Sequence, residues 1–334
     1  MVRKVLIFLL VGLLLVGCGG RGELGMSAPE SFPQREIIFQ GMWRSAPLER
    51  RYSLGFVNAD GSGLTFVELR ALQIGWYQVL YPVWSPDGST VVFRASEYAG
   101  GGGPLMVVQA GKGVQGILHC SDATWGLSRV SFVEGGQRVV ADIRFGSKQS
   151  ARYVLDLIDL EGCWIVRPYY TGGMDWEELV GEPSISPDGQ WLAFSRGTRA
   201  EGWETKVVVL ELASGQETVI GKGCCPSWSP DGRWLAYTAT VGGLERKPEG
   251  IYVVSLDSGQ RKRLVSFPRT PWGWEPAPSW SPDGQWLVYH RCMEEWCSGE
   301  DATQYSIFKV HIETGEEVKI VDGGLNPYWR QVRP

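Results

Sequence analysis

The chain has 334 residues, of which 43% are hydrophobic and 21% charged, and its formal net charge is −5. A mildly acidic protein lacks the basic surface that nucleic-acid binding requires, so we expect no nucleic-acid partner. The hydrophobic content agrees with a globular domain.

Residues 1–17 have the features of a secretory signal: a basic start, then an apolar run from Val5 to Val16 that is too short to span a membrane. The stretch Leu15-Val16-Gly17-Cys18 resembles a bacterial lipobox. That resemblance implies cleavage before Cys18 and a lipid on this cysteine. The alternative is a plain signal anchor with an incidental cysteine.

We therefore expect an exported protein that Cys18 anchors to a membrane. The anchor lies on the outer side of the cytoplasmic membrane, at the outer membrane or at the cell surface. Residues 18–34, which follow the signal, consist of the lipidated cysteine and a stretch of Gly, Ser, Pro and charged residues, which predicts a flexible tether. The remaining residues, 35–334, are expected to form one domain.

The first predicted strand, Glu36–Gln40, has no partner strand before it in the sequence. Tyr52–Val57 and Leu64–Leu69 form the next two, joined by a turn at Asn58–Gly63. This turn superficially resembles a calcium-binding loop. It lacks the spaced carboxylates and the closing Glu, so we interpret it as a turn only.

A motif Trp-Ser-Pro-Asp-Gly then recurs at Trp84–Gly88, Trp228–Gly232 and Trp280–Gly284, and Ile185–Gly189 differs only in its first residue. Pro fixes the first corner of a turn, Asp tolerates the second corner, and Gly takes the positive φ that returns the chain. An apolar triplet such as Val91-Val92-Phe93 follows each copy. The motif therefore predicts a hairpin between two strands.

Two weaker copies complete a repeat with steps of about 50 residues: Phe132–Gly136, and the half-copy Asn326–Trp329. After each hairpin, two more strands flank a Gly-containing turn, as in Ile251–Gly259 and Arg261–Val265. The fold class is therefore all-β, a six-bladed β-propeller of four-stranded blades. The last strand is expected to pair with Glu36–Gln40, which closes the ring and removes open strand edges.

These motifs resemble the TolB-like, WD-type β-propeller repeats. The stretches Trp228–Tyr237, Ile251–Gly259 and Val57–Gly63 carry the resemblance most clearly, and it covers roughly residues 35–334. It is specific for the fold and weak for function. It implies a propeller that serves as a binding platform in the cell envelope.

We assign a structural role to the motif residues, with the Trp side chains packing blades together and the Asp and Gly residues forming the turns. These residues are Trp84, Asp87, Gly88, Asp188, Gly189, Trp228, Asp231, Gly232, Trp280, Asp283, Gly284 and Trp329.

Eight other tryptophans fall in predicted loops that all emerge on one face of a propeller. They either cap the core or form a ligand face for a protein, peptide or saccharide. These are Trp43, Trp76, Trp125, Trp176, Trp203, Trp272, Trp274 and Trp296.

The cysteines beyond Cys18 leave several pairings open. Cys292 and Cys297 share one predicted loop and could pair locally. A vicinal disulfide of Cys224 and Cys225 is possible but strained.

The search for catalytic residues finds no convergent set. The three histidines occur in different contexts without metal-ligand spacing, and there is no Gly-x-Ser-x-Gly elbow. We expect no catalytic residue, metal or cofactor, and a monomer that acts as a binding platform. The alternatives are a polysaccharide lyase or glycosidase with carboxylates near the central tunnel, and a structural spacer in an envelope assembly.

Overall fold

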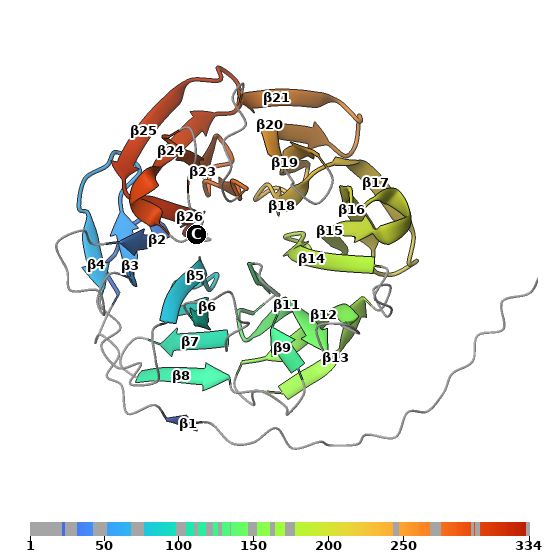
Figure 1. The fold of residues 1–334 in the computed structure, drawn as a ribbon, viewed down its shortest axis with the longest axis horizontal. Helices are drawn as coiled ribbons and strands as arrows, with labels where there is room; N and C mark the ends of the chain where they lie inside the picture. The colour runs from blue at the N-terminus through green and yellow to red at the C-terminus, as the bar shows by residue number, and fades with distance from the viewer. Residues whose placement is uncertain are drawn as a thin grey trace, which may run out of the picture.

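The computed structural model describes residues 22–23, 32–42, 52–67, 77–97, 105–109, 113–117, 123–125, 129–133, 135–145, 152–160, 164–170, 178–242, 247–267, 275–294, 297 and 301–331. They form six antiparallel sheets set as blades around a central axis (Figure 1). The predicted six-bladed propeller is confirmed.

Each blade runs from an inner strand at the axis to an outer strand at the rim. The strands of each blade are given in that order. Blade 1 contains β26 (Gly324–Trp329), β2 (Ile37–Met42), β3 (Tyr52–Val57) and β4 (Thr65–Val67). Blade 2 contains β5 (Tyr77–Trp84), β6 (Thr90–Glu97), β7 (Leu105–Gln109) and β8 (Gly113–Ile117), and blade 3 contains β10 (Ser131–Phe132), β11 (Arg138–Phe145), β12 (Arg152–Asp159) and β13 (Trp164–Tyr170). Blade 4 contains β14 (Glu178–Ile185), β15 (Trp191–Thr198), β16 (Thr205–Glu211) and β17 (Glu217–Lys222); blade 5 contains β18 (Cys224–Trp228), β19 (Trp234–Val241), β20 (Lys247–Ser255) and β21 (Arg261–Ser266); blade 6 contains β22 (Ser279–Trp280), β23 (Trp286–Cys292), β24 (Tyr305–His311) and β25 (Glu317–Asp322).

The C-terminal strand closes the ring. β26 pairs antiparallel with β2, with Ile37 opposite Trp329 and Gln40 opposite Leu325. Arg330, just beyond this strand, places its guanidinium carbon 5.3 Å from the ring centroid of Trp84 in blade 2. The two ends of the propeller chain are therefore joined in blade 1, as the repeat pattern predicted.

The Ser-Pro-Asp-Gly turns repeat one hydrogen-bond pattern. In blade 4, Ser186 Oγ donates to Asp188 Oδ1 at 2.5 Å and accepts from the amide of Trp191 at 2.9 Å. Gly189 has φ 71°, the left-handed value that favours glycine. The other three copies of the motif make the same two bonds. The motif aspartates therefore stabilise the turns between the first and second strands.

The core lies between neighbouring blades. Six clusters of buried side chains each join two adjacent sheets. The lead tryptophans belong to these clusters, with Trp84 1% exposed and Trp280 2% exposed. Full burial of one indole removes about 150–250 Å² from water, on the order of 4–6 kcal/mol as an upper bound.

Some local features differ from the sequence-based expectation. Gly22–Glu23, within the segment expected to be a flexible tether, forms β1 and pairs with the outer strand β8 of blade 2. The outer strand of a blade has unpaired backbone groups with which a further strand can pair. Trp125, expected in a loop, ends β9 (Ala123–Trp125), which pairs with β11. Within the described ranges, the 3-10 helix η2 (Arg199–Glu201) lies between β15 and β16, and η4 (Ala302–Gln304) lies directly before β24.

Cys18 and the predicted signal at residues 1–17 lie outside the described residues. Within the described ranges, the structure contains no helix with the length and hydrophobicity needed to cross a membrane.

Candidate functional site

The inner strands share an unusual backbone feature near the axis. Four residues that are not glycine have positive φ values: Tyr81 at 51°, Glu182 at 56°, Cys225 at 60° and Asn326 at 50°. Each lies three residues before the lead position of its repeat, and each accompanies a register shift in the pairing with the second strand. A strained conformation repeated at one position of a repeat is a built-in bulge.

The bulge turns a backbone amide toward the neighbouring blade. The amide of Cys225 in blade 5 donates to Glu182 Oε2 at 2.8 Å and to Ser195 Oγ at 3.3 Å, both in blade 4. In the same way, the amide of Asn326 in blade 1 donates to His290 Nδ1 in blade 6 at 3.2 Å. The bulges therefore link blades through polar side chains close to the axis.

The second strands supply those polar side chains at one equivalent position per blade. We call this set the polar belt. Every member is 6% exposed or less. Its members are Gln40, Arg94, Asp142, Ser195, Thr238 and His290.

Buried polar groups require partners, and the belt finds them largely in the inner strands. Ser195 Oγ donates to Glu182 Oε2. Thr238 Oγ1 donates to the carbonyl oxygen of Pro276 in the next blade. The side-chain Nδ2 of Asn326 donates to Gln40 Oε1 at 3.1 Å.

Arg129 occupies the bulge position of blade 3 and crosses the axis. Its guanidinium donates to the carbonyl oxygens of Ala277 at 3.5 Å, Pro278 at 3.3 Å and Pro327 at 2.9 Å, which belong to the inner segments of blades 6 and 1. The guanidinium carbon lies 5.2 Å from the ring centroid of Tyr328. Burial lowers the pKa of Arg129, while Tyr328 and other nearby groups act in the opposite direction.

A cavity of about 790 Å³ surrounds the axis at the end of the propeller that carries the Ser-Pro-Asp-Gly turns. We call it the axial funnel. All six blades contribute to its wall. Its lining is rich in proline and aromatic side chains: Pro86, Pro183, Pro187, Pro226, Pro230, Pro282, Trp84, Phe132, Trp228 and Tyr328. Arg129 lies at its inner end, because its repeat position is farthest from the turns.

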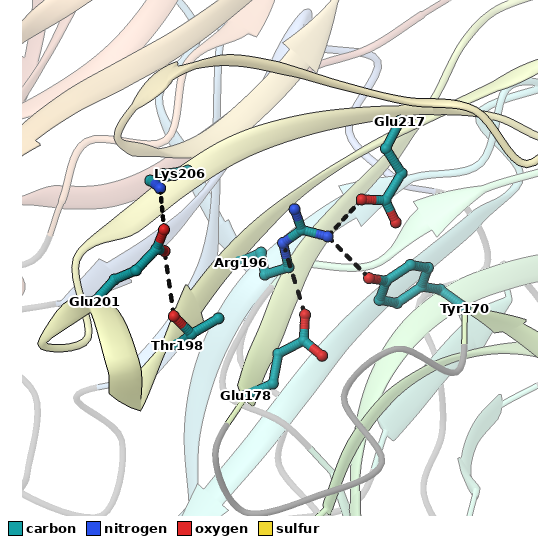
Figure 2. A network of polar contacts seen from close by, with 7 residues as sticks. All are labelled: Tyr170, Glu178, Arg196, Thr198, Glu201, Lys206 and Glu217. Atoms are coloured by element: carbon teal, nitrogen blue, oxygen red, sulfur yellow. Dashed lines mark hydrogen bonds and ion pairs between the residues drawn. The ribbon is translucent and has the colours of Figure 1, made fainter.

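A second polar network joins blades 3 and 4 (Figure 2). Arg196 Nη1 donates to the hydroxyl of Tyr170 at 3.1 Å and to Glu217 Oε2 at 2.5 Å, and its Nε lies 3.6 Å from Glu178 Oε1. Burial raises the pKa of Tyr170 to about 12, although the bond from Arg196 acts to lower it. This network fixes one blade against the next.

The same view shows how the loop that carries Trp203 is held (Figure 2). Glu201 pairs with Lys206 and accepts a hydrogen bond from Thr198 Oγ1 at 3.2 Å. Trp203 is half-buried, has φ 62°, and donates its amide to the carbonyl oxygen of Thr198 at 2.9 Å. This is the one predicted loop tryptophan whose side-chain exposure the structure describes.

The rest of the predicted tryptophan face stays a prediction. The backbone of Trp125 is described and its side chain is not. The remaining members lie outside the described residues: Trp43, Trp76, Trp176, Trp272, Trp274 and Trp296.

The cysteines divide into two cases. Cys292 and Cys297 form a disulfide with their Cα atoms 5.9 Å apart. The Sγ atoms of Cys224 and Cys225 lie 3.0 Å apart, which is longer than a disulfide bond. The hydrogen bond between these two thiols, burial and the charges of Glu182 and Glu275 raise the pKa of the Cys225 thiol.

Sequence reasoning missed the polar belt, although the signal was present. Each belt residue directly follows the apolar triplet of its repeat, as Arg94 follows Val91-Val92-Phe93 and Ser195 follows Leu192-Ala193-Phe194. A polar residue at the same place in every copy could have been recognised by aligning the copies one residue further.

Comparisons with known proteins agree with the propeller fold. The sequence model of the TolB beta propeller domain matches residues 128–320. Among solved structures, TolB from Acinetobacter baumannii is similar, with a TM-score of 0.64 and 15% identity, covering 92% of this chain and 67% of that chain.

A putative 6-phosphogluconolactonase from Bacteroides uniformis is also similar, with a TM-score of 0.49 and 13% identity, covering 88% of this chain and 98% of that chain. At 15% identity, the likeness to the TolB structure shows the fold alone. The comparison with curated proteins gave no significant match.

Proposed function

This chain belongs to the TolB beta propeller domain family, and from that premise we propose that it is a cell-envelope protein whose propeller binds a protein segment in the axial funnel. The observation that carries the proposal is the funnel itself. Its volume of about 790 Å³ falls within the range of ligand-binding pockets, roughly 300–1,000 Å³. All six blades contribute to its wall, so the closed ring holds it in shape.

The lining suits a polypeptide. Proline rings and aromatic faces offer rigid apolar surface, and such surfaces bind extended peptides with little loss of conformational entropy. Arg129 contributes positive charge at the inner end, which favours a segment that carries a carboxylate over a basic one.

The proposed role is binding and not catalysis. Two carboxylates on the inner and second strands already have partners: Glu182 accepts hydrogen bonds from Ser195 and Cys225, and Asp142 acts electrostatically on Arg94. Groups committed to holding blades together in this way are poorly placed to act as a paired acid and base. The lyase or glycosidase alternative gains no specific support.

Export and anchoring complete the proposal. The lipobox-like Leu15-Val16-Gly17-Cys18 supports a lipid on Cys18 that keeps the propeller at a membrane surface, where the partner would be encountered. Cells that express wild type and Cys18→Ala would be labelled with a palmitate analogue. Label on the wild type alone is expected, and equal label on both would remove the anchor from the proposal.

The binding test uses a library of random peptides displayed on phage, selected against the chain from Glu23 onward. Ser184→Trp and Ser227→Trp each place an indole on the funnel wall, whereas the backbone carbonyls of these residues keep their bonds. Ser258→Trp, on an exposed turn at the same end, is the matched control.

Selected peptides should lose at least about tenfold in affinity for both funnel variants and bind the control as they bind wild type; about 1.4 kcal/mol corresponds to tenfold. Trp272→Ala/Trp274→Ala tests the tryptophan face in the same assay. Peptides that ignore the funnel variants but lose binding to this double variant would move the site to that face. If no peptide is selected and the chain binds a glycan array, the proposed ligand would be a saccharide and not a peptide.

A further inference from the structure

The side chains of Cys224, Cys225 and Glu182 form a compact cluster of potential metal ligands where the bulges of blades 4 and 5 meet. Among the residues that the structure describes, this is the one group of three whose potential ligand atoms all lie close together, within 4.8 Å of one another. We propose that it is a binding site for Zn²⁺, held by two thiolates and one carboxylate.

The bulge of blade 5 creates the pair of thiols. Successive side chains of a regular strand point to opposite faces, so adjacent cysteines should be separated. The φ of 60° at Cys225, together with the register shift between Cys224 and Ser227, breaks this alternation. As a result, the two Sγ atoms lie 3.0 Å apart.

Glu182 comes from the equivalent bulge one blade earlier and faces the thiols. Its Oε2 accepts from the Cys225 amide at 2.8 Å and from Ser195 Oγ. These bonds orient the carboxylate toward the cysteine pair. Hydrogen bonds of this kind around a ligand set typically contribute about 10–100-fold to metal affinity.

The chemistry of the cluster matches zinc. Thiolates are soft ligands that favour d¹⁰ cations, and zinc accepts mixed sulfur and oxygen ligands in a tetrahedral arrangement with Zn–S about 2.3 Å. That geometry places the two sulfurs about 3.8 Å apart, so a small rotation of the two side chains opens the pair enough. The ion replaces the two thiol protons, which pass to solvent.

The charges around the cluster also favour a divalent cation. Glu275 adds a second carboxylate close enough to act on Cys225. The Arg129 guanidinium also interacts with Cys225, but three backbone carbonyls of other blades hold it. The carboxylates of Glu182 and Glu275 add negative charge beside the two thiols, which favours a divalent cation there.

Binding is tested on the full chain in detergent, kept reduced and titrated with Zn²⁺ against a chromophoric chelator. The site variants are Cys224→Ser/Cys225→Ser and Glu182→Gln. The matched controls remove the same number of cysteines elsewhere: Cys120→Ser/Cys163→Ser and Cys292→Ser/Cys297→Ser. Wild type and both controls should bind one Zn²⁺ more tightly than the cysteine variant by at least about 100-fold, and Glu182→Gln should weaken binding by about tenfold or more.

Zinc X-ray absorption on the wild type tests the site without a substitution. The expected spectrum has two sulfur neighbours at about 2.3 Å with oxygen ligands completing the shell. A shell without two sulfurs would overturn the proposal, as would equal affinity in wild type and Cys224→Ser/Cys225→Ser. A Cys224–Cys225 disulfide that persists in the isolated protein and excludes zinc would also overturn it.

Discussion

The indole Nε1 of Trp280 donates a 2.9 Å hydrogen bond to the carbonyl oxygen of Ser227, one blade earlier in the ring. Trp228 makes the equivalent bond, at 3.0 Å, to Ser184. Each of these tryptophans therefore fills the gap between two sheets with its ring and satisfies its N–H on the preceding inner strand.

Serines extend this series of contacts around the axis. The amide of Ile185 donates to Ser131 Oγ at 2.9 Å, and the amide of Trp329 donates to Ser279 Oγ at 3.0 Å. Together with the two indole bonds, these contacts connect blades 3, 4, 5, 6 and 1 in sequence. Hydrogen bonds between the inner strands of neighbouring blades thus add to the apolar packing between sheets.

Trp280→Phe tests how much the hydrogen bond from Trp280 to Ser227 contributes to the free energy of unfolding. The substitution removes the indole donor and part of the buried ring, so we expect the free energy of unfolding to fall by about 1–3 kcal/mol. Trp234→Phe, at a half-buried position on the second strand of blade 5, is the control and should cost under about 1 kcal/mol. Urea denaturation measures both, and equal losses would show that the bond to Ser227 contributes nothing.

Asp188 is expected to make stability depend on pH in the acid range. The hydrogen bond from Ser186 lowers its pKa, as does the amide of Gln190, although partial burial acts to raise it. Since the folded pKa lies below the unfolded value of about 3.9, the ionised carboxylate stabilises the fold above that value. This contribution is lost as the pH falls through the folded pKa.

Asp188→Asn should therefore lower the melting temperature at neutral pH and flatten the decline of stability between about pH 5 and about pH 2. Thermal unfolding followed by circular dichroism across this range is the measurement. Curves for wild type and variant that stay parallel down to the lowest pH would show that Asp188 does not contribute to the acid dependence.

The sequence predicted the fold because each repeat carries its own local information. A Pro, an Asp and a Gly at fixed places in Trp228–Gly232 determine a turn, and six repeats at a regular spacing, two of them weaker copies, determine a ring. The contacts of Arg129 could not be predicted in this way. Its acceptors at Ala277, Pro278 and Pro327 become neighbours only after the ring has closed, so they depend on blade geometry and not on a local pattern.

The substitution Arg129→Met tests whether this side chain ties the two sides of the ring together. Losing the guanidinium leaves the carbonyl oxygens of Ala277, Pro278 and Pro327 without their charged donor, and a hydrogen bond to a charged group contributes about 1.5–3 kcal/mol. We expect a loss of about 2–4 kcal/mol in the free energy of unfolding. Arg129→Lys, which keeps the charge but reaches fewer carbonyls, should lose less. Equal stability of Arg129→Met and wild type in urea would contradict the role.

Removal of the closing strand tests the joining of the two ends. A chain that stops after Asp322 lacks β26, so the inner edge of β2 loses its partner and the lead residue Trp329 leaves the cluster it shares with Ile37 and Val288. Open strand edges promote pairing with other chains. We expect lower amide protection in β2 and β3, earlier unfolding and dimers or larger aggregates in size-exclusion chromatography.

A chain that lacks only residues 332–334 is the matched control and should behave as wild type, because β26 and its contacts to blade 6 are retained. Adding a synthetic peptide of residues 324–334 to the shortened chain should restore protection in β2, since the strand can pair from outside as it does in the intact ring. If the chain that stops after Asp322 unfolds as cooperatively as the control, with amide protection in β2 unchanged, ring closure by β26 does not stabilise the propeller, and the packing between blades alone holds it together.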